Sequence, residues 1–310
     1  MNNTLMLIDG NAFVHRAFHA IPPLNAPDGK LVNAVYGFFS IFLSALASVH
    51  PKWVCVAFDE PGPTFRDTLY DAYKATRQKA PQSLYDQFPL IKHLLDAFAI
   101  PHIGCKGYEA DDIIGTMCRI VKSEKYKNQN QNENSKIIIV TGDNDVFQLI
   151  NDRVSVMTPS NGSLREPMLI DSEGVVKKYG FGPEFMVDYK ALRGDASDNI
   201  PGVAGVGEKT ATTLIQTYGH LDDIYAHCGD IAPAVATKLV NGKKEADLSL
   251  TLATIATDAP VTIDLESATL KDFDHPRVVK ELEKLGFKSL IKRLPTSTRI
   301  KQNHTQPSLL

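Results

Sequence analysis

Three aspartates stand just after short apolar runs of the chain. They are Asp9, Asp59 and Asp143, and the runs cover residues 4–8, 53–58 and 136–140. Continuous apolar runs of this length, bounded by turn residues, are typical of strands buried on both faces of a parallel sheet. Because the carboxyl ends of parallel strands meet at one edge, we expect these three carboxylates to lie close together.

Further carboxylates are grouped in short motifs. A Glu-Ala-Asp-Asp run, an Asp-Asn-Asp turn and a Gly-Asp-Ala-Ser-Asp segment contribute Glu109, Asp111, Asp112, Asp145, Asp195 and Asp198. Taken singly, each acid could cap a helix or form a turn. Carboxylates gathered at one place repel one another and need compensating cations. Oxygen ligands without His or Cys favour Mg²⁺ or Mn²⁺. Two such ions hydrolyse phosphodiesters by activating a water and stabilising the leaving oxygen.

A glycine-rich stretch, residues 199–215, is the second chemical signal. Gly202, Gly205 and Gly207 allow a tight turn that opens a helix near residue 208, where Lys209 and Thr210 follow. Free N–H groups at a helix start bind phosphate, and the pattern predicts a helix–hairpin–helix that grips a DNA backbone without reading its sequence. The spacing does not match a nucleotide-binding P-loop.

The elements that must position these residues change along the chain. Helical patterns at 35–49 and 84–98 alternate with the strand-like runs, and 99–104 and 153–157 could add strands, so we expect an α/β core with a mostly parallel sheet over 1–180. From 181 to 295 we expect a helical domain, with helices at 185–192, 208–218, 221–226, 232–240, 243–252 and 276–285. The polar stretch 127–135 predicts a surface loop, and 296–310 a frayed tail.

Overall composition limits the class of protein. The chain has 310 residues and a net charge of −3; setting the nine motif acids aside as metal ligands leaves a mildly basic remainder that suits a DNA partner. No apolar run reaches the roughly 18–20 residues of a membrane span. The start of the chain lacks a basic leader, and the four cysteines form no CxxC pair, so we expect buried free thiols in a cytoplasmic protein without a membrane partner.

Together these motifs resemble the 5′-nuclease (flap endonuclease) superfamily over residues 4–290. The bacterial type is the nearest match; it includes the N-terminal 5′-3′ exonuclease domain of DNA polymerase I and free-standing relatives. The motifs stand in family order, from Leu-Ile-Asp-Gly-Asn at Asp9 to the glycine hairpin. The resemblance implies a PIN-like, mostly parallel sheet, a helical arch at about 64–98 and a helical helix–hairpin–helix (H3TH) domain.

The resemblance also assigns roles to residues. It implies two or more Mg²⁺ ions, with Mn²⁺ as a substitute, held by Asp9, Asp59, Glu109, Asp111, Asp112, Asp143, Asp145, Asp195 and Asp198. Arg66, Lys74 and Arg77 match basic arch residues that would hold the scissile phosphate. Arg16 stands where bacterial relatives carry a similar arginine. In the family the hairpin can also hold a monovalent cation, often K⁺.

The function that follows is a structure-selective 5′-3′ exonuclease and 5′ flap endonuclease in primer removal and repair. Its expected partners are DNA ends, flaps or nicks, including RNA-primed ones, and a DNA polymerase; the expected state is a monomer. Two alternatives stay open. A PIN-type RNase would share the sheet-edge acids but lack the arch and the hairpin. A non-catalytic module for branched DNA would not need the complete set of acids.

Overall fold

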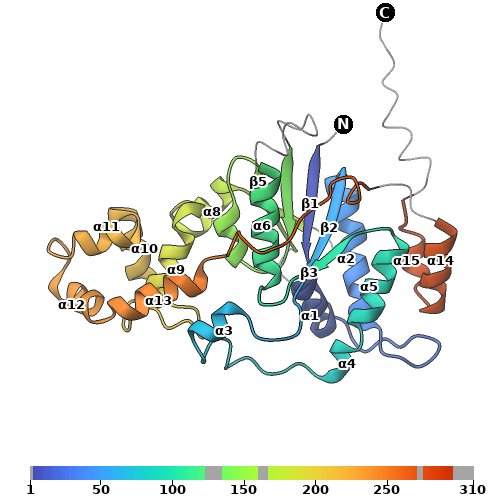
Figure 1. Cartoon of the computed structure of the whole chain (residues 1–310), viewed down its shortest axis with the longest axis horizontal. Helices are drawn as coiled ribbons and strands as arrows, with labels where there is room; N and C mark the ends of the chain where they lie inside the picture. Colours follow the sequence, from blue (N-terminus) through green and yellow to red (C-terminus); the bar gives the residue numbers. More distant parts are fainter. Residues whose placement is uncertain (1–2, 123–134, 160–166, 271–274, 296–310) are drawn as a thin grey trace, which may run out of the picture.

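A six-stranded sheet forms the centre of the molecule (Figure 1). The computed structural model describes residues 3–122, 135–159, 167–270 and 275–295. The strands are β1 (Thr4–Asp9), β2 (Trp53–Phe58), β3 (His102–Gly104), β4 (Lys136–Val140), β5 (Val154–Pro159) and β6 (Pro167–Ile170). Their order is β3-β2-β1-β4-β5-β6, with every pair parallel except β5 and β6. The expected α/β core with a mostly parallel sheet is therefore confirmed, and β6 is an antiparallel edge strand that the sequence did not reveal.

Helices cover both faces of this sheet. In the first part of the chain they are α1 (Gly10–Ala20), α2 (Asn33–Val49), α3 (Phe65–Leu69), α4 (Gln82–Tyr85), α5 (Phe88–Ala97), α6 (Ala110–Lys122), the 3-10 helix η1 (Asp145–Leu149) and α8 (Ser172–Tyr179). Alternate residues of β1 explain the layering, because successive side chains of a strand point to opposite faces. Leu5 and Leu7 pack in one core with α6 and α8, whereas Met6 and Ile8 pack in a second core with α1, α2 and α5.

The second part of the chain is helical, as expected. After η2 (Pro183–Phe185) come α9 (Met186–Arg193), α10 (Glu208–Tyr218), α11 (Leu221–Ala226), α12 (Pro233–Asn241), α13 (Lys243–Ala253), α14 (His275–Lys284) and α15 (Lys288–Ile291). Helices α9 to α13 form a unit at one end of the molecule (Figure 1). Their bounds lie within a residue or so of those predicted from apolar spacing.

The chain then returns to the first domain. Trp53 of β2 pairs with Thr269 in an isolated bridge, and α14 and α15 pack against α5 and α2. Leu282 and Phe287 are buried in the same core as α2 and α5. The sequence pattern predicts that residues 181–295 form one helical domain. The structure instead places 275–294 on the α/β core, because the apolar face of α14 finds its partner there.

One segment, residues 64–87, crosses the carboxyl edge of the sheet, and we call it the crossing segment. It contains the short helices α3 and α4 joined by turns. The arch was expected to run to about residue 98, but α5 belongs to the core: Ile91, Leu94 and Leu95 are fully buried against α2 and the sheet. The part of the chain that spans the site therefore ends before α5.

Other expectations from composition can be compared with the structure. Cys55 and Cys118 are buried free thiols, and burial raises the pKa of each to about 12, while Cys105 and Cys228 are half-buried. Within the described residues, no helix combines the length and the apolar character needed to cross a membrane. The expected tail and all of the expected polar loop except Ser135 lie outside the described residues.

Candidate active site

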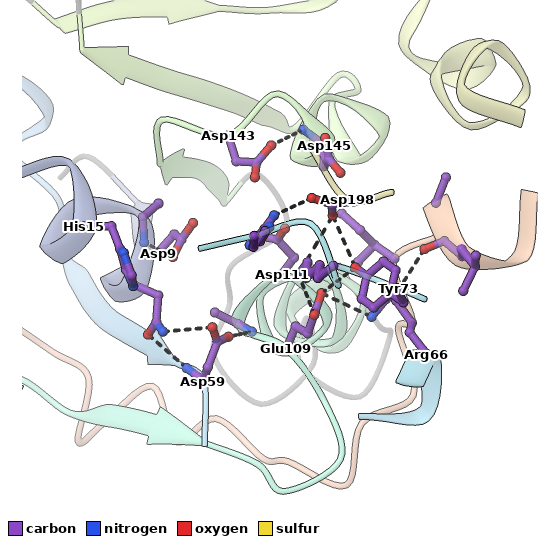
Figure 2. A pocket seen from close by; sticks show the side chains of 18 of the residues that line it. Asp9, His15, Asp59, Arg66, Tyr73, Glu109, Asp111, Asp143, Asp145 and Asp198 are labelled. Carbon is purple, nitrogen blue, oxygen red and sulfur yellow. Dashed lines mark hydrogen bonds and ion pairs between the residues drawn. The ribbon is translucent and has the colours of Figure 1, made fainter. Parts of the chain in front are cut away.

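A cavity of about 410 Å³ lies at the carboxyl edge of the sheet, between the strand ends and the crossing segment (Figure 2). Its charged lining consists of seven carboxylates and three cations: Asp9, Asp59, Glu109, Asp111, Asp143, Asp145, Asp198, Arg66, Lys74 and Arg77. The structure thus brings together most of the predicted site residues, from both domains. Acids outnumber cations, so the cavity favours a bound cation.

Four carboxylates form one wall of the cavity at the strand ends. We call Asp9, Asp59, Asp143 and Asp145 the strand-end wall, and hydrogen bonds hold its carboxylates in place. Asp9 caps α1, accepting from the Ala12 amide at 2.9 Å and from the Thr141 hydroxyl at 2.8 Å. Asp59 accepts from the Asn11 side chain at 2.8 Å and from the Ala110 amide at 2.7 Å. Backbone donors and neighbouring side chains therefore fix how these two carboxylates point.

The turn after β4 carries the other two acids of this wall. The hydroxyl of Thr141 accepts from the Asp143 amide at 3.0 Å, and the Asp143 carboxylate accepts from the Asp145 amide at 2.9 Å. Burial, together with the nearby Asp143, raises the pKa of Asp145 to about 7, although Lys190 is in contact with it. Burial also raises the pKa of Asp9 to about 7.

Asp111 lies in the middle of the cavity (Figure 2). Among the described residues it forms no hydrogen bond or ion pair. Burial raises its pKa well above the ordinary value, and the nearby charges of Asp9, Asp143 and Asp145 act in the same direction. A desolvated carboxylate surrounded by other carboxylates and lacking a donor is the arrangement that a divalent cation would stabilise.

Asp112, from the same motif, has a different role. It is fully buried, does not line the cavity, and forms a two-pronged ion pair with Arg66, with both N–O distances 2.8 Å. Its oxygens also accept from the amides of Glu109 and Ala256. The predicted metal role of Asp112 does not agree with this geometry, because its oxygens are already engaged.

The contacts of Arg66 likewise differ from those expected of a phosphate-binding residue. It is 3% exposed, and besides Asp112 it donates to the carbonyls of Leu252 and Thr254, each at 2.8 Å. A guanidinium with its donors engaged in this way is not free to hold a phosphate. Arg66 instead joins the start of the crossing segment to α6 and to the end of α13.

The crossing segment places three further polar groups against the acids. Lys74 donates to Glu109 at 2.5 Å, Arg77 pairs with Asp198, and the Tyr73 hydroxyl donates to both acids at 3.2 and 3.3 Å. Lys74 adopts a positive φ of 54°, and its amide donates to the Asp198 carbonyl at 2.9 Å. Lys74 and Arg77, expected to hold phosphate, are therefore present at the cavity and paired with its carboxylates.

Of the two acids from the helical unit, only Asp198 lines the cavity. Asp195 accepts from the amide and hydroxyl of Ser197 at 2.9 and 2.6 Å and from Lys190 at 2.7 Å. Although burial opposes it, these partners lower the pKa of Asp195 to about 2. Lys190 was not singled out in the sequence, because a lysine in an amphipathic helix usually points to solvent.

Tyr73 and His15 also line the cavity, although the sequence assigned no role to either. Tyr73 immediately precedes Lys74 in the matched arch motif, and His15 immediately precedes Arg16 in the first helix. For His15, the three-to-four spacing from Asn11 and Ala12 places it on the same face of α1, and all three line the cavity. Burial lowers the pKa of His15, so its ring is neutral at neutral pH. Arg16 lies beside the turn at Gly142.

The predicted hairpin joins α9 to α10. Gly202 has a φ of +63°, and a Cβ there would lie 2.3 Å from the Gly194 amide nitrogen, so only glycine fits. Gly205 also has a positive φ, and its carbonyl accepts from Lys238 at 3.0 Å. Gly207 precedes α10 without a side-chain cap, and Lys209 is exposed with the half-buried Thr210 beside it. The first turn of α10 is thus open to a ligand.

In the described part of the chain, no three His, Cys, Asp or Glu side chains are already gathered as a finished metal shell. The acids are spread along the cavity and several are paired with Lys or Arg. The donor chemistry nevertheless fits a hard divalent cation, because the anionic ligands of the cavity are all carboxylates, negative charge is in excess, and Asp111 has no partner among the described residues.

Comparison with known proteins gives consistent matches. The model of the 5′-3′ exonuclease N-terminal resolvase-like domain matches residues 4–180, and that of the 5′-3′ exonuclease C-terminal SAM fold matches 181–276. DNA polymerase I of Caldicellulosiruptor bescii is 40% identical over 296 residues, which are 94% of this chain and 34% of that protein. DNA polymerase I of Chloroflexus aurantiacus is 42% identical over 301 residues, 94% and 31% of the two chains. This chain thus spans about a third of these relatives.

Two solved structures share the fold. The T5 5′-exonuclease, solved with bound zinc, matches with a TM-score of 0.64 and 21% identity, covering 91% of this chain and 99% of that one. Flap endonuclease-1 from Methanococcus jannaschii matches with a TM-score of 0.59 and 16% identity, covering 98% and 94%. The expected combination of a sheet-based nuclease core and a following helical domain agrees with both.

Proposed function

This chain belongs to the 5′-3′ exonuclease family, and we propose that it hydrolyses DNA phosphodiester bonds from 5′ ends and at the base of 5′ flaps. The observation that carries this proposal is the cavity itself. Seven carboxylates from both domains line it, under a segment that brings the side chains of Lys74 and Arg77 beside them. An acidic cavity of this kind is suited to metal-assisted phosphodiester hydrolysis rather than to sequence-specific DNA binding.

The proposed ligands of two Mg²⁺ ions, or of Mn²⁺ in their place, are the cavity carboxylates and Asp195. The set is Asp9, Asp59, Glu109, Asp111, Asp143, Asp145, Asp195 and Asp198, without the ion-paired Asp112. When bound, such ions supply a water of lowered pKa and charge stabilisation for the leaving oxygen. The unpaired Asp111, at the centre of the set, supports this assignment.

The chain's own residues bind and orient the substrate. Lys74 and Arg77 now neutralise Glu109 and Asp198, and a phosphate entering the cavity would offer the same cations a competing anion. Their proposed role is to hold the scissile phosphate against the strand-end wall and to offset the negative charge that develops on it. Tyr73, between the same two acids, keeps this part of the crossing segment in register with them.

The hairpin is the proposed grip on the DNA backbone away from the cut. The glycines Gly202, Gly205 and Gly207 form the turn, and the first turn of α10 with Lys209 and Thr210 faces solvent. Helix starts of this kind bind phosphate through backbone N–H groups. We extend the proposal to a K⁺ ion bound at the hairpin and to a backbone contact from Arg16.

The wider biological setting is part of the same proposal. Because the matched relatives are DNA polymerase I and this chain spans a third of them, we place its work beside a DNA polymerase, in primer removal and repair. The substrates are then nicks and flaps, including RNA-primed ones. We further propose that the protein acts as a monomer in the cytoplasm, at the nucleoid.

The decisive experiment compares cleavage of a labelled 5′-flap duplex with cleavage of single-stranded RNA, in Mg²⁺ and in excess chelator. We expect short 5′ products from the flap only with metal, loss of activity in Asp143→Ala, and retention in Asp247→Ala. Asp247 is a matched control because it forms an exposed pair with Lys243. Tight flap binding without cleavage under any divalent ion would show a DNA-binding module, and preference for RNA would indicate a PIN-type RNase.

The hairpin assignment is tested by salt dependence. Lys209→Ala should weaken flap binding about equally for all sequences and reduce the slope of log K against log salt by about one, the amount lost with one phosphate contact. Lys280→Ala is the control, since Lys280 is also exposed but stands in α14, which packs on α5 of the α/β core. An equal effect of the two substitutions would remove the hairpin from the proposal.

A further inference from the structure

Lys190 of α9 is a buried lysine at the boundary between the two domains. Its side chain is 9% exposed, and its ammonium contacts Asp145 of η1 and lies 2.7 Å from Asp195, in the loop after α9. Asp145 belongs to the strand-end wall, whereas Asp195 belongs to the helical unit. One ammonium group therefore bridges carboxylates from the two parts of the chain.

The position of this ammonium relative to the cavity carries the inference. Asp145 lines the cavity, but neither Asp195 nor Lys190 does. One oxygen of the Asp195 carboxylate accepts from the amide and hydroxyl of Ser197, and the other accepts from the Lys190 ammonium. As the structure stands, the ammonium is bonded to this oxygen of Asp195, and the oxygen becomes available to a metal ion when the ammonium moves away.

A lysine is buried at a cost unless acids compensate its charge, and here two acids do so. The reverse also holds, since Asp145 would otherwise lie among carboxylates with Asp143 as its near neighbour. The lysine thus provides, in the protein alone, the compensation that a bound cation would provide.

We propose that the Lys190 ammonium stands in for a second cation between Asp145 and Asp195 and is displaced when a divalent ion bridges these two carboxylates. Lys190 then sets the affinity of that position by competing for it. This rests on the proposed metal-dependent function. The first ion, held around Asp111, does not depend on the lysine, and the two positions should differ in affinity for this reason.

The first test measures Mn²⁺ binding by calorimetry, without DNA, to the full chain and to Lys190→Met. We expect the weaker class of site to tighten about tenfold or more in the variant, since a competing charge has been removed, while the tighter class changes little. Lys243→Met, which breaks an exposed lysine–aspartate pair with a 2.9 Å contact, should match the unchanged protein. The melting temperature should rise more on Mn²⁺ addition in Lys190→Met than in either other protein.

The second test uses the unsubstituted protein, so it decides the matter even if Lys190→Met does not fold. Amine-reactive labelling is followed residue by residue by mass spectrometry, with and without Mn²⁺. Displacement predicts that Lys190 is labelled several-fold faster with metal, while the rate at Lys243 stays constant. Unchanged labelling of Lys190 at saturating Mn²⁺ overturns the displacement of Lys190 but leaves the proposed function intact. Identical Mn²⁺ binding by Lys190→Met and the unsubstituted protein has the same meaning. If none of the three proteins binds Mn²⁺, the proposed metal-dependent function itself is overturned.

Discussion

The strand-end wall and the crossing segment face each other across one cavity, but the chain holds them in different ways. Asp9, Asp59 and Asp143 follow parallel strands of a buried sheet, and each carboxylate accepts a hydrogen bond from a backbone amide. Lys74 and Arg77 stand on turns between short helices, and their partners are the cavity acids themselves. The wall is positioned by the fold, whereas the middle of the crossing segment, around Lys74 and Arg77, is positioned by charge.

This difference suggests how the cavity works. Groups that must keep a fixed spacing lie on the rigid sheet, where a change of a few tenths of an ångström requires the core to move. Groups that must exchange one anion for another lie on a segment with few buried contacts, whose local opening requires less free energy. The following predictions test this division, and the first concerns the wall.

Asp111→Asn should produce the largest effect. We expect kcat on a flap to fall by roughly 10³-fold or more, because the central oxygen ligand loses its charge. The same substitution should stabilise the metal-free protein by about 1 kcal/mol, because it removes an unpaired carboxylate from among like charges. Cleavage assays and thermal unfolding in chelator measure the two effects. A variant that is both inactive and less stable would show that Asp111 is a structural residue.

Arg66→Met tests a buried anchor of the crossing segment. Removing the guanidinium leaves the fully buried Asp112 without its partner, and breaking a buried pair from one side costs about 3–5 kcal/mol. Urea unfolding should report this loss. The double variant Arg66→Met with Asp112→Leu should recover much of it, because the uncompensated charge is then gone. A small cost in the single variant would mean that the pair does not anchor the segment.

Arg77→Ala tests the middle of the crossing segment, which ion pairs with the cavity acids hold in place. Its side chain is 48% exposed and its partners are Asp198 and the Ser197 carbonyl, so we expect a stability loss below about 1 kcal/mol. The effect on kcat/KM should be larger, about 10–30-fold, since a phosphate contact in the transition state is lost. Steady-state kinetics and thermal unfolding on the same samples separate the two. Comparable losses in both would contradict the division between wall and segment.

The pH dependence of stability should reveal the wall. Folding raises the pKa of Asp9 and Asp145 to about 7, so the native state retains protons that the unfolded chain releases above pH 4. Stability of the metal-free protein should therefore fall as pH rises from about 4 to 7 and level off above that, and the two groups together contribute about 2–3 kcal/mol of the fall between pH 6 and 8. Asp195, with its pKa lowered, contributes nothing to this window. Denaturant titrations in chelator should show the fall, and saturating Mg²⁺ should reduce it; a rise with pH would contradict the assignment.

The parts of this molecule that sequence could predict are those with local causes. The apolar runs before Asp9, Asp59 and Asp143 identified β1, β2 and β4, and apolar spacing identified α9 to α13. The short β6, an antiparallel edge strand with exposed Met168 and Leu169, gave no comparable signal.

Pairings between distant residues were the parts that sequence could not supply. The motif Glu-Ala-Asp-Asp contains three acids, and nothing in it indicates that Arg66 engages Asp112 while Asp111 has no partner in the described part of the chain. Nor does the apolar face of α14 indicate that its partner is α5 rather than a helix of its own domain. Such choices depend on which surfaces meet in space, and a single sequence does not contain that information.

The return of the chain from α13 to β2 has a consequence for turnover. The helical unit is tethered to the sheet twice, once through the segment before α9 and once through residues 254–270. A doubly tethered unit stays close to its partner. If the two halves of the cavity separate, the tethers therefore keep them at a high effective concentration for one another. A contact as modest as that between Arg77 and Asp198 can therefore re-form without help from another molecule.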